Sequence, residues 1–235
     1  EDGIRDTSVT GVQTCALPIY PGTTAPVEAS YLRKGAAASL MKPEDLDTQL
    51  IASSRWLHTT GITCAISTSA AATAAAGLEI ARKAGIKKSF DLNIRRKLWS
   101  EEQARKVLEP IARDVDLLIG GEDEYCAIFG TSDPQEALRI AASRNNELVI
   151  MTHGPEQLTY AVAGEITVVH PPQVKSVDPV GSGDAFTSGV ISGLLGGLTF
   201  SDAIAQGTIS GARVASQFGD WAGLPSGKSG ITDQS

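Results

Sequence analysis

Short apolar runs alternate along this chain with longer segments in which apolar residues recur at helical spacing. The runs predict strands, and the longer segments predict helices bounded by capping residues, proline or glycine. Strands are predicted over 55–61, 87–93, 115–121 and 147–154, and helices over 43–53, 67–84, 100–114, 122–130 and 133–144. A hairpin is predicted over 158–172, and a long helical region follows the glycine-rich segment 177–184. Alternating strands and helices predict an α/β fold with a doubly wound, mostly parallel sheet and helices on both faces.

Both ends of the chain depart from this pattern. Residues 1–19 show neither helical nor strand periodicity and resemble a translated adaptor or vector fragment. We interpret them as a foreign segment, with an irregular native arm as the alternative. Residues 226–235 form a polar tail. The predicted domain therefore covers residues 20–225.

Composition and charge exclude some partners rather than identify one. The net charge of −7 argues against nucleic acid or an anionic membrane as a partner bound by bulk electrostatics. The sequence contains no long apolar run, so no membrane span is expected. The three cysteines are far apart and form no CxxC motif, which disfavours disulfides and zinc and favours a reducing cytoplasm.

The strongest chemical signal is the segment VDPVGSGDAF at 177–186. Gly181, Ser182 and Gly183 can point successive main-chain N–H groups into one concavity. A helix that begins near Asp184 adds further N–H groups and its positive dipole end, so the segment predicts a site for a phosphoryl group in transfer. The Asp184 carboxylate at its mouth can accept a proton from an attacking hydroxyl, which is general-base chemistry.

Two other interpretations fit the same residues. Asp184 is also suited to cap the N-terminus of the helix. The segment also partly matches a GxGxxG dinucleotide loop, which would indicate a Rossmann oxidoreductase, although Phe186 replaces the third glycine and the loop lies late in the chain. A GxxxxGK[ST] motif does not occur in the sequence, which excludes a P-loop enzyme.

The run DPVGSGDAF resembles the DTxGAGDxF signature of the ribokinase or PfkB family of sugar kinases. The resemblance implies that Asp184 is the catalytic base, that Gly181, Ser182 and Gly183 form an anion hole, and that the cofactors are ATP and Mg²⁺. It also suggests that Asp178 helps to order the loop, with a carboxylate that caps a turn as the structural alternative.

Four further segments resemble 2-keto-3-deoxygluconate kinases within this family. They are YLRKGAAAS at 31–39, WLHTTGITCAIS at 56–67, FDLNIRRKLWS at 90–100 and FGDWAGLP at 218–225. The resemblance implies that a sugar acid is contacted by Tyr31, Arg33, Ile62, Arg95 and Asp220. Arginine and tyrosine donors suit a substrate with a carboxylate, a ketone and hydroxyls. The alternative for residues 95–97 is a solvated basic turn.

The segments that resemble the nucleotide side of the family match less completely. GGEDE at 120–124 aligns with the family's NxxE motif, which implies that Glu124 organises Mg²⁺ through water, although Gly121 replaces the usual asparagine. MTHGPEQ at 151–157 aligns with a nucleotide-binding turn, so Thr152 and Gly154 are expected to contact ATP, whereas Gln157 replaces a glycine. Thr208 takes the position of an adenine-side asparagine.

As a whole, the resemblance implies an ATP-dependent phosphotransferase that acts on the terminal hydroxyl of 2-keto-3-deoxygluconate. Fructokinase, ribokinase, 5-dehydro-2-deoxygluconokinase and an inactive sugar-binding module stay open as alternatives. Compared with a full-length family member, the N-terminal strands, a GGxxxN-type motif and most of the lid are expected to be missing. The chain alone is then expected to be poorly stable, because a wound sheet that lacks strands exposes an edge. A homo-oligomer stays open for the full-length parent.

Overall fold

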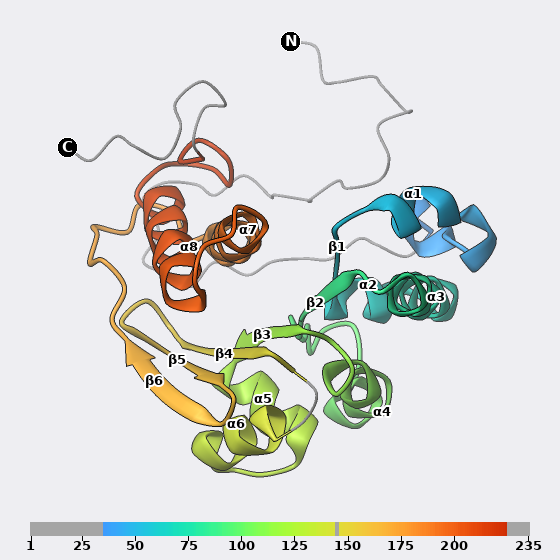
Figure 1. The fold of residues 1–235 in the computed structure, drawn as a ribbon, viewed down its shortest axis with the longest axis horizontal. Helices are drawn as coiled ribbons and strands as arrows, with labels where there is room; N and C mark the ends of the chain where they lie inside the picture. The colour runs from blue at the N-terminus through green and yellow to red at the C-terminus, as the bar shows by residue number, and fades with distance from the viewer. Residues whose placement is uncertain (1–34, 144–145, 225–235) are drawn as a thin grey trace. The chain divides into compact units, whose positions relative to one another are not determined.

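The computed structural model describes residues 35–143 and 146–224. The chain divides into two compact units, Glu1–Asn146 and Glu147–Ser235, which we describe separately (Figure 1). Tyr31 and Arg33, two of the residues expected to contact a sugar acid, lie outside the described residues. The segments 1–19 and 226–235 also lie outside them.

The first unit contains three parallel strands. They are β1 (Trp56–Thr60), β2 (Lys87–Asp91) and β3 (Leu117–Gly121), and β2 pairs with both of the others. Thr60 lies opposite Asp91, which in turn lies opposite Ile119. Because parallel strands run in the same direction, the loops that follow them leave the sheet at one edge. This is the edge at which α/β proteins usually bind ligands.

Helices connect these strands and flank them. The first unit contains η1 (Ala37–Leu40), η2 (Pro43–Asp45), α1 (Thr48–Ser53), α2 (Gly61–Ile66), α3 (Thr68–Ala84), α4 (Glu101–Ala112), α5 (Glu122–Phe129) and α6 (Pro134–Ala142). Helix α3 contacts β1 and β2, whereas α5 contacts β3. Strands linked through helices confirm the α/β class.

Local capping explains where these helices begin and end. The Ser67 hydroxyl accepts the Ala70 N–H at 3.0 Å at the start of α3, and Gly85 ends that helix with a φ of 70°. Such a left-handed residue after the last turn is typical of a glycine-terminated helix. The single helix predicted over 43–53 is wrong in one respect. The carboxylate of Asp47 accepts the Leu50 N–H at 2.9 Å and starts a new helix there, so the segment is divided into η2 and α1.

The second unit begins with three antiparallel strands, β4 (Leu148–His153), β5 (Gln157–Val162) and β6 (Glu165–Val169). The predicted hairpin through Gly164 is confirmed as the connection between β5 and β6. Ala163 and Gly164 at its tip have φ angles of 50° and 84°. Two successive positive φ angles are typical of the tight turns that match the twist of paired strands.

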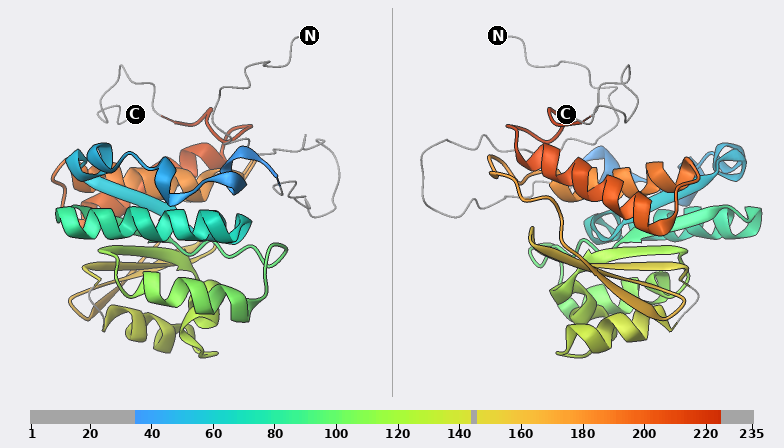
Figure 2. Two further views of the ribbon diagram at one scale, coloured as in Figure 1. Left: turned by 90° about the vertical axis from the view of Figure 1, so that its right-hand side faces the viewer. Right: turned by 60° about the vertical axis from the view of Figure 1, so that its left-hand side comes forward.

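Helices α7 (Ser182–Leu195) and α8 (Phe200–Ala215) complete the second unit and lie side by side in every view (Figure 2). Glycines form their contact. A Cβ atom on Gly189 would lie 2.8 Å from the Cα of Gly207, and one on Gly207 would lie 2.8 Å from the carbonyl oxygen of Phe186. The two backbones therefore touch, which larger side chains would prevent.

Both units have a buried apolar core. Large side chains that are fully buried include Phe90, Leu118, Tyr125, Ile150 and Ile204. Among the described residues, every helix is too short or too polar to cross a membrane.

Candidate functional site

The glycine-rich loop leads directly into helix α7. Gly181 is the residue before the first turn, with a φ of 80° and a ψ of −8°, and the helix begins at Ser182. Asp184 is therefore the third residue of the helix rather than its cap. The interpretation of Asp184 as the N-terminal cap is wrong, because no side chain caps this helix end. Its carboxylate is exposed, and no hydrogen bond or ion pair to it occurs within the described part of the chain.

The main-chain N–H groups at this helix end are not all free. The N–H of Ser182 donates to the carbonyl oxygen of Pro179 at 3.2 Å, and the Ser182 hydroxyl donates to the same oxygen at 2.7 Å. Contrary to the expectation from the sequence, the N–H of Ser182 is therefore engaged within the loop and does not face an anion site. Within residues 35–143 and 146–224, the N–H groups of Gly181, Gly183 and Asp184 have no acceptor. These donors and the helix dipole favour an anion at this point.

The two glycines of the loop have different surroundings. A Cβ atom on Gly181 would lie 2.7 Å from the Cβ of Asp220, and the residue also needs its positive φ. No atom lies within 4 Å of a Cβ placed on Gly183. Folding therefore requires glycine at 181, whereas the space beside Gly183 is open to a ligand.

Asp178 holds the start of the loop from within the protein. It is only 6% exposed. One carboxylate oxygen accepts the Val180 N–H at 3.0 Å, and the other accepts the Gly219 N–H at 3.2 Å. The first bond is the local turn that the sequence predicts. The second bond joins residues 41 positions apart and had no local signal in the sequence.

Asp220, the residue expected to contact a sugar hydroxyl, is half-buried against Gly181. The turn that carries it follows α8, and the Leu224 N–H closes it by donating to the carbonyl oxygen of Trp221 at 3.0 Å. The second unit therefore brings Asp220 beside the loop that precedes Asp184.

The expected nucleotide contacts occupy two places in the second unit. Thr152 is near the end of β4, and Gly154 in the following turn has a φ of 69° with open space around it. The next residue after Thr152, His153, is held by the Thr159 hydroxyl at 2.9 Å. Thr208 is buried in α8, and its hydroxyl donates to the carbonyl oxygen of Ala205 at 2.7 Å. That hydroxyl is therefore engaged within its own helix.

In the first unit, three of the expected residues follow the carboxyl ends of the parallel strands. Ile62 lies in the first turn of α2 after β1, Arg95 lies in the loop after β2, and Glu124 lies in the first turn of α5 after β3. Gly61, which precedes Ile62, lies closely against the loop after β2, because a Cβ there would overlap the carbonyl oxygen of Leu92. The sheet edge thus gathers these residues within one unit.

Glu124 is fixed by main-chain donors. One carboxylate oxygen accepts the Ile94 N–H at 2.6 Å, and the other accepts the Gly121 N–H at 2.8 Å. Each oxygen keeps a lone pair for a water molecule, so the carboxylate fits a cation held through water. No group of three His, Cys, Asp or Glu side chains that could bind a metal directly occurs in the described ranges.

Arg95 and Arg96 differ sharply, although they are neighbours. Arg96 is exposed, and its Nε donates to Glu101 at 2.7 Å. The Nε of Arg95 is buried and has no hydrogen-bond partner among the described residues. The interpretation as a solvated basic turn therefore fits Arg96 but does not fit the buried Nε of Arg95. Trp99 in the same loop also has a buried Nε1 for which the described ranges offer no partner, a feature that the sequence did not reveal.

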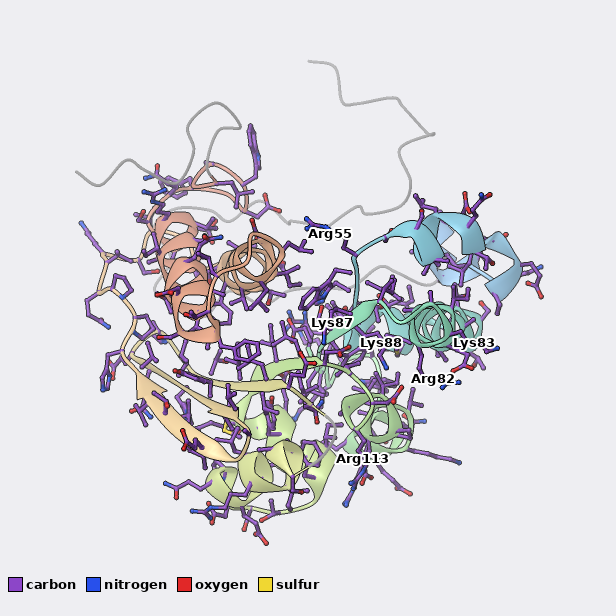
Figure 3. The ribbon with its side chains drawn as sticks, in the orientation of Figure 1. Arg55, Arg82, Lys83, Lys87, Lys88 and Arg113 are labelled. Carbon is purple, nitrogen blue, oxygen red and sulfur yellow. The ribbon has the colours of Figure 1, made fainter. Side chains whose placement is uncertain are left out.

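A second group of basic residues lies at the amino ends of the parallel strands and on the helices that precede them (Figure 3). The labelled residues are Arg55, Arg82, Lys83, Lys87, Lys88 and Arg113. Glu79 pairs with both basic residues at the end of α3, Asp116 and Asp114 pair with the two lysines of β2, and Glu109 pairs with Arg113. Four carboxylates thus pair with five of the six labelled cations, so we do not assign an anion site to the group.

The chain resembles known proteins over most of its described length. The family model described as pfkB family carbohydrate kinase matches residues 14–226. The chain is 31% identical to a 2-dehydro-3-deoxygalactonokinase of Haloferax volcanii, over 84% of this chain and 63% of that protein. It is also 31% identical to a 2-dehydro-3-deoxygluconokinase of Thermoproteus tenax, over 83% of this chain and 60% of that protein. The chain therefore spans about 60% of the length of these curated relatives.

Solved structures give the same result. A PfkB protein from Polaromonas sp. JS666 superposes with a TM-score of 0.73 at 33% identity, covering 83% of this chain and 65% of that one. Among the curated relatives, fructokinases and 5-dehydro-2-deoxygluconokinases also match this chain, at 28% to 32% identity. The resemblance thus identifies the fold and the family, but relatives that act on different sugars match about equally well.

Proposed function

Because the chain belongs to the pfkB family of carbohydrate kinases, we propose that its protein transfers the γ-phosphoryl group of ATP to a hydroxyl of 2-keto-3-deoxygluconate. The observation that carries this proposal is the end of helix α7. There, an exposed and unpaired carboxylate lies beside main-chain N–H groups that have no acceptor among the described residues.

Asp184 is proposed to accept the proton of the sugar hydroxyl. The hydroxyl oxygen then forms a bond to the γ-phosphorus, while the bond between that phosphorus and the β–γ bridging oxygen breaks and ADP leaves. The N–H groups of Gly183 and Asp184, and with them Gly181, would donate to the oxygens of the phosphoryl group. Donors fixed before the reaction stabilise the charge that spreads over these oxygens, and this is a large part of catalysis in phosphoryl transfer.

A sugar acid is proposed as the substrate because of the donors at the first unit's sheet edge. Arg95 offers a guanidinium whose buried Nε finds no acceptor in the part of the chain that the structure describes, and a carboxylate or ketone oxygen would supply one. Ile62 is proposed to pack against the sugar carbons, and Asp220 to accept from a hydroxyl. Tyr31 and Arg33 are proposed as further contacts on the strength of their motif alone.

ATP and Mg²⁺ are proposed as cofactors. Glu124 would hold the cation through water, since each of its oxygens already accepts one main-chain N–H. A bound Mg²⁺ would offset the charge of the phosphates. Thr152 and Gly154 are proposed on the nucleotide side because they border an open turn. Thr208 is proposed there on the strength of its aligned position alone, since its side chain is buried and its hydroxyl is engaged with Ala205.

The test is a coupled assay of ADP release with Mg-ATP, on the protein encoded by the complete gene. The substrates are 2-keto-3-deoxygluconate, 2-keto-3-deoxygalactonate, fructose and ribose, and Asp184→Asn is the control. We expect turnover of the keto acids, and a fall in kcat of about 1,000-fold or more in the control. Turnover of fructose or ribose alone would refute the sugar-acid assignment. No turnover by a folded protein would favour a sugar-binding module.

A further inference from the structure

The loop that follows β2 contains two buried side-chain donors. The Nε of Arg95 and the Nε1 of Trp99 are both buried, and neither finds a hydrogen-bond acceptor in the described part of the chain. Both groups can only donate, because neither a guanidinium nor an indole N–H accepts a hydrogen bond. A buried donor without a partner destabilises a folded protein, so two of them in one loop call for a ligand that supplies the acceptors.

Hydrogen bonds fix the loop on both sides of these donors. Directly before Arg95, the carboxylate of Glu124 accepts the main-chain N–H of the loop at 2.6 Å. Directly after Trp99, the capping box that starts α4 holds the chain through two hydrogen bonds of 2.9 and 3.2 Å. Between them, the Leu98 N–H donates to the carbonyl oxygen of Arg95 at 2.8 Å. The two donors are therefore held in place before any ligand binds, which lowers the entropy lost on binding.

The turn closed by Leu98 also brings the two donor residues close to each other. A turn of this kind places its first and fourth residues within about 7 Å, and Trp99 is the next residue along the chain. Arg96 lies inside the turn but is exposed, and its Nε donates to Glu101 at 2.7 Å. The loop leaves the carboxyl end of β2, which is the edge of the sheet where α/β proteins bind ligands.

We propose that Trp99 is a second donor for the carboxylate of the sugar acid, alongside Arg95. This inference rests on the proposed function, which assigns only Arg95 to that end of the substrate. A carboxylate suits the pair, because it accepts hydrogen bonds without donating any and has one oxygen for each donor. Its binding would satisfy both buried N–H groups at once, so Trp99 would help to select a sugar acid over a neutral sugar.

The first test follows the indole N–H resonances of the protein encoded by the complete gene, with Trp99→Phe to assign the signal. Trp56 is the internal reference, because its Nε1 already donates to the Ser89 hydroxyl at 2.8 Å. We expect 2-keto-3-deoxygluconate to move the Trp99 indole proton downfield, as a new hydrogen bond does, and to leave the Trp56 signal unchanged. A Trp99 signal that stays in place at saturating sugar acid would overturn the inference. So would a Trp99 proton that is already hydrogen-bonded before sugar is added.

The second test compares the kinetics of Trp99→Phe and Trp56→Phe, which both keep an aromatic ring but remove the indole N–H. Trp99→Phe should raise the KM for the sugar acid by about 10-fold or more and change kcat by less than about twofold, because the lost bond is present in the ground state and the transition state alike. For the carboxyl-reduced analogue, its KM should change by less than about twofold. Trp56→Phe should leave both KM values unchanged. Equal KM changes for the two substrates in Trp99→Phe would refute the contact and reduce the ring to a support of the loop.

Failure of the proposed function gives a different result. A wild-type protein that phosphorylates no sugar, but whose Trp99 signal moves with the sugar acid, would refute the proposed function and keep the contact. Turnover of the keto acids with an unmoved Trp99 signal would keep the proposed function and overturn the inference. If Trp99→Phe does not fold, the wild-type resonances decide the question.

Discussion

Gly181 lies against Asp220, so close that any side chain on the glycine would displace the aspartate. The carbonyl oxygen and Cα of Asp220 would each be 2.9 Å from a Cβ at position 181, well inside van der Waals contact. The neighbouring loop glycine, Gly183, has no such contact. The two loop glycines therefore serve different purposes: Gly181 is needed for the backbone to fit against Asp220, and Gly183 leaves room for a ligand.

Alanine at the two glycines should therefore have opposite effects. We expect Gly181→Ala to lower the free energy of unfolding by about 1–3 kcal/mol, because its φ is positive and the Cβ overlaps Asp220. Gly183→Ala should leave stability unchanged or raise it by up to about 1 kcal/mol, because it removes a glycine from the first turn of α7. Denaturant unfolding of both variants measures the difference.

Activity should follow a different order. Gly183→Ala should lower kcat for sugar phosphorylation by about 100-fold or more, since its methyl group would occupy the space proposed for the phosphoryl oxygens. A stable Gly183→Ala protein with wild-type kcat would show that the phosphoryl group does not approach this backbone.

Arg95 and Arg96 form a matched pair for the substrate assignment. Arg95→Met should raise the KM for a sugar acid by about 10- to 100-fold, with little loss of stability, because its buried Nε has no partner to lose within residues 35–143 and 146–224. Arg96→Met removes an exposed ion pair with Glu101 and should change stability by less than about 1 kcal/mol and KM by less than twofold. Steady-state kinetics with a sugar acid and with its carboxyl-reduced analogue measure both effects. Equal KM changes for the two substrates would refute the contact between Arg95 and the carboxylate.

Glu124 should matter for folding as well as for the cation. Glu124→Gln replaces one acceptor oxygen by an NH₂ group that faces a main-chain N–H, so we expect a loss of about 1–3 kcal/mol in the free energy of unfolding. Asp123→Asn is the control, because Asp123 is largely exposed and its distance to Arg96 is 3.9 Å. Thermal unfolding of the two variants without Mg²⁺ measures the loss of stability alone. The Mg²⁺ dependence of turnover then measures the effect of Glu124→Gln on cation binding. An unchanged melting temperature in Glu124→Gln would contradict the two hydrogen bonds.

His58 on β1 should make stability depend on pH. Burial lowers the pKa of His58 from 6.5 to about 4, and its Nδ1 lies 2.8 Å from the Ser89 hydroxyl. The unfolded chain then binds a proton more readily than the folded one between pH 6.5 and pH 4. This contribution to stability is therefore complete above pH 6.5 and is lost as the pH falls toward 4. The loss should be no more than about 1 kcal/mol, because His58 as a residue is exposed on β1 although its ring is desolvated, and water screens its charge.

Unfolding midpoints measured from pH 7 to pH 4 check this expectation. His58→Asn should flatten the curve in that interval. Identical curves for His58→Asn and the wild type would assign the acid sensitivity to other groups.

The sequence allowed most of the elements, and the position of Asp184 at a helix start, to be predicted, because these depend on local spacing. It could not reveal that the Ser182 N–H donates to the carbonyl oxygen of Pro179, because the partner of a main-chain donor depends on how the turn closes. Nor could the sequence reveal the hydrogen bond that the Gly219 N–H donates to the Asp178 carboxylate, which forms only when α7 and α8 pack together. The different burial of Arg95 and Arg96 was also hidden, because adjacent residues of one charge look alike until the loop after β2 is placed.

The backbone contact between α7 and α8 has a consequence for how this protein can vary. The carboxylate proposed as the base belongs to α7, yet the depth at which α7 lies is set by glycines of α8, such as Gly207, whose Cβ would lie 2.6 Å from Val190. A methyl group added on α8 would push α7 away and move Asp184 with it, without touching the carboxylate or either proposed ligand. The glycines of α8 that contact α7, although they never meet substrate, should therefore tolerate almost no increase in size, and their substitution should impair turnover before it unfolds the protein.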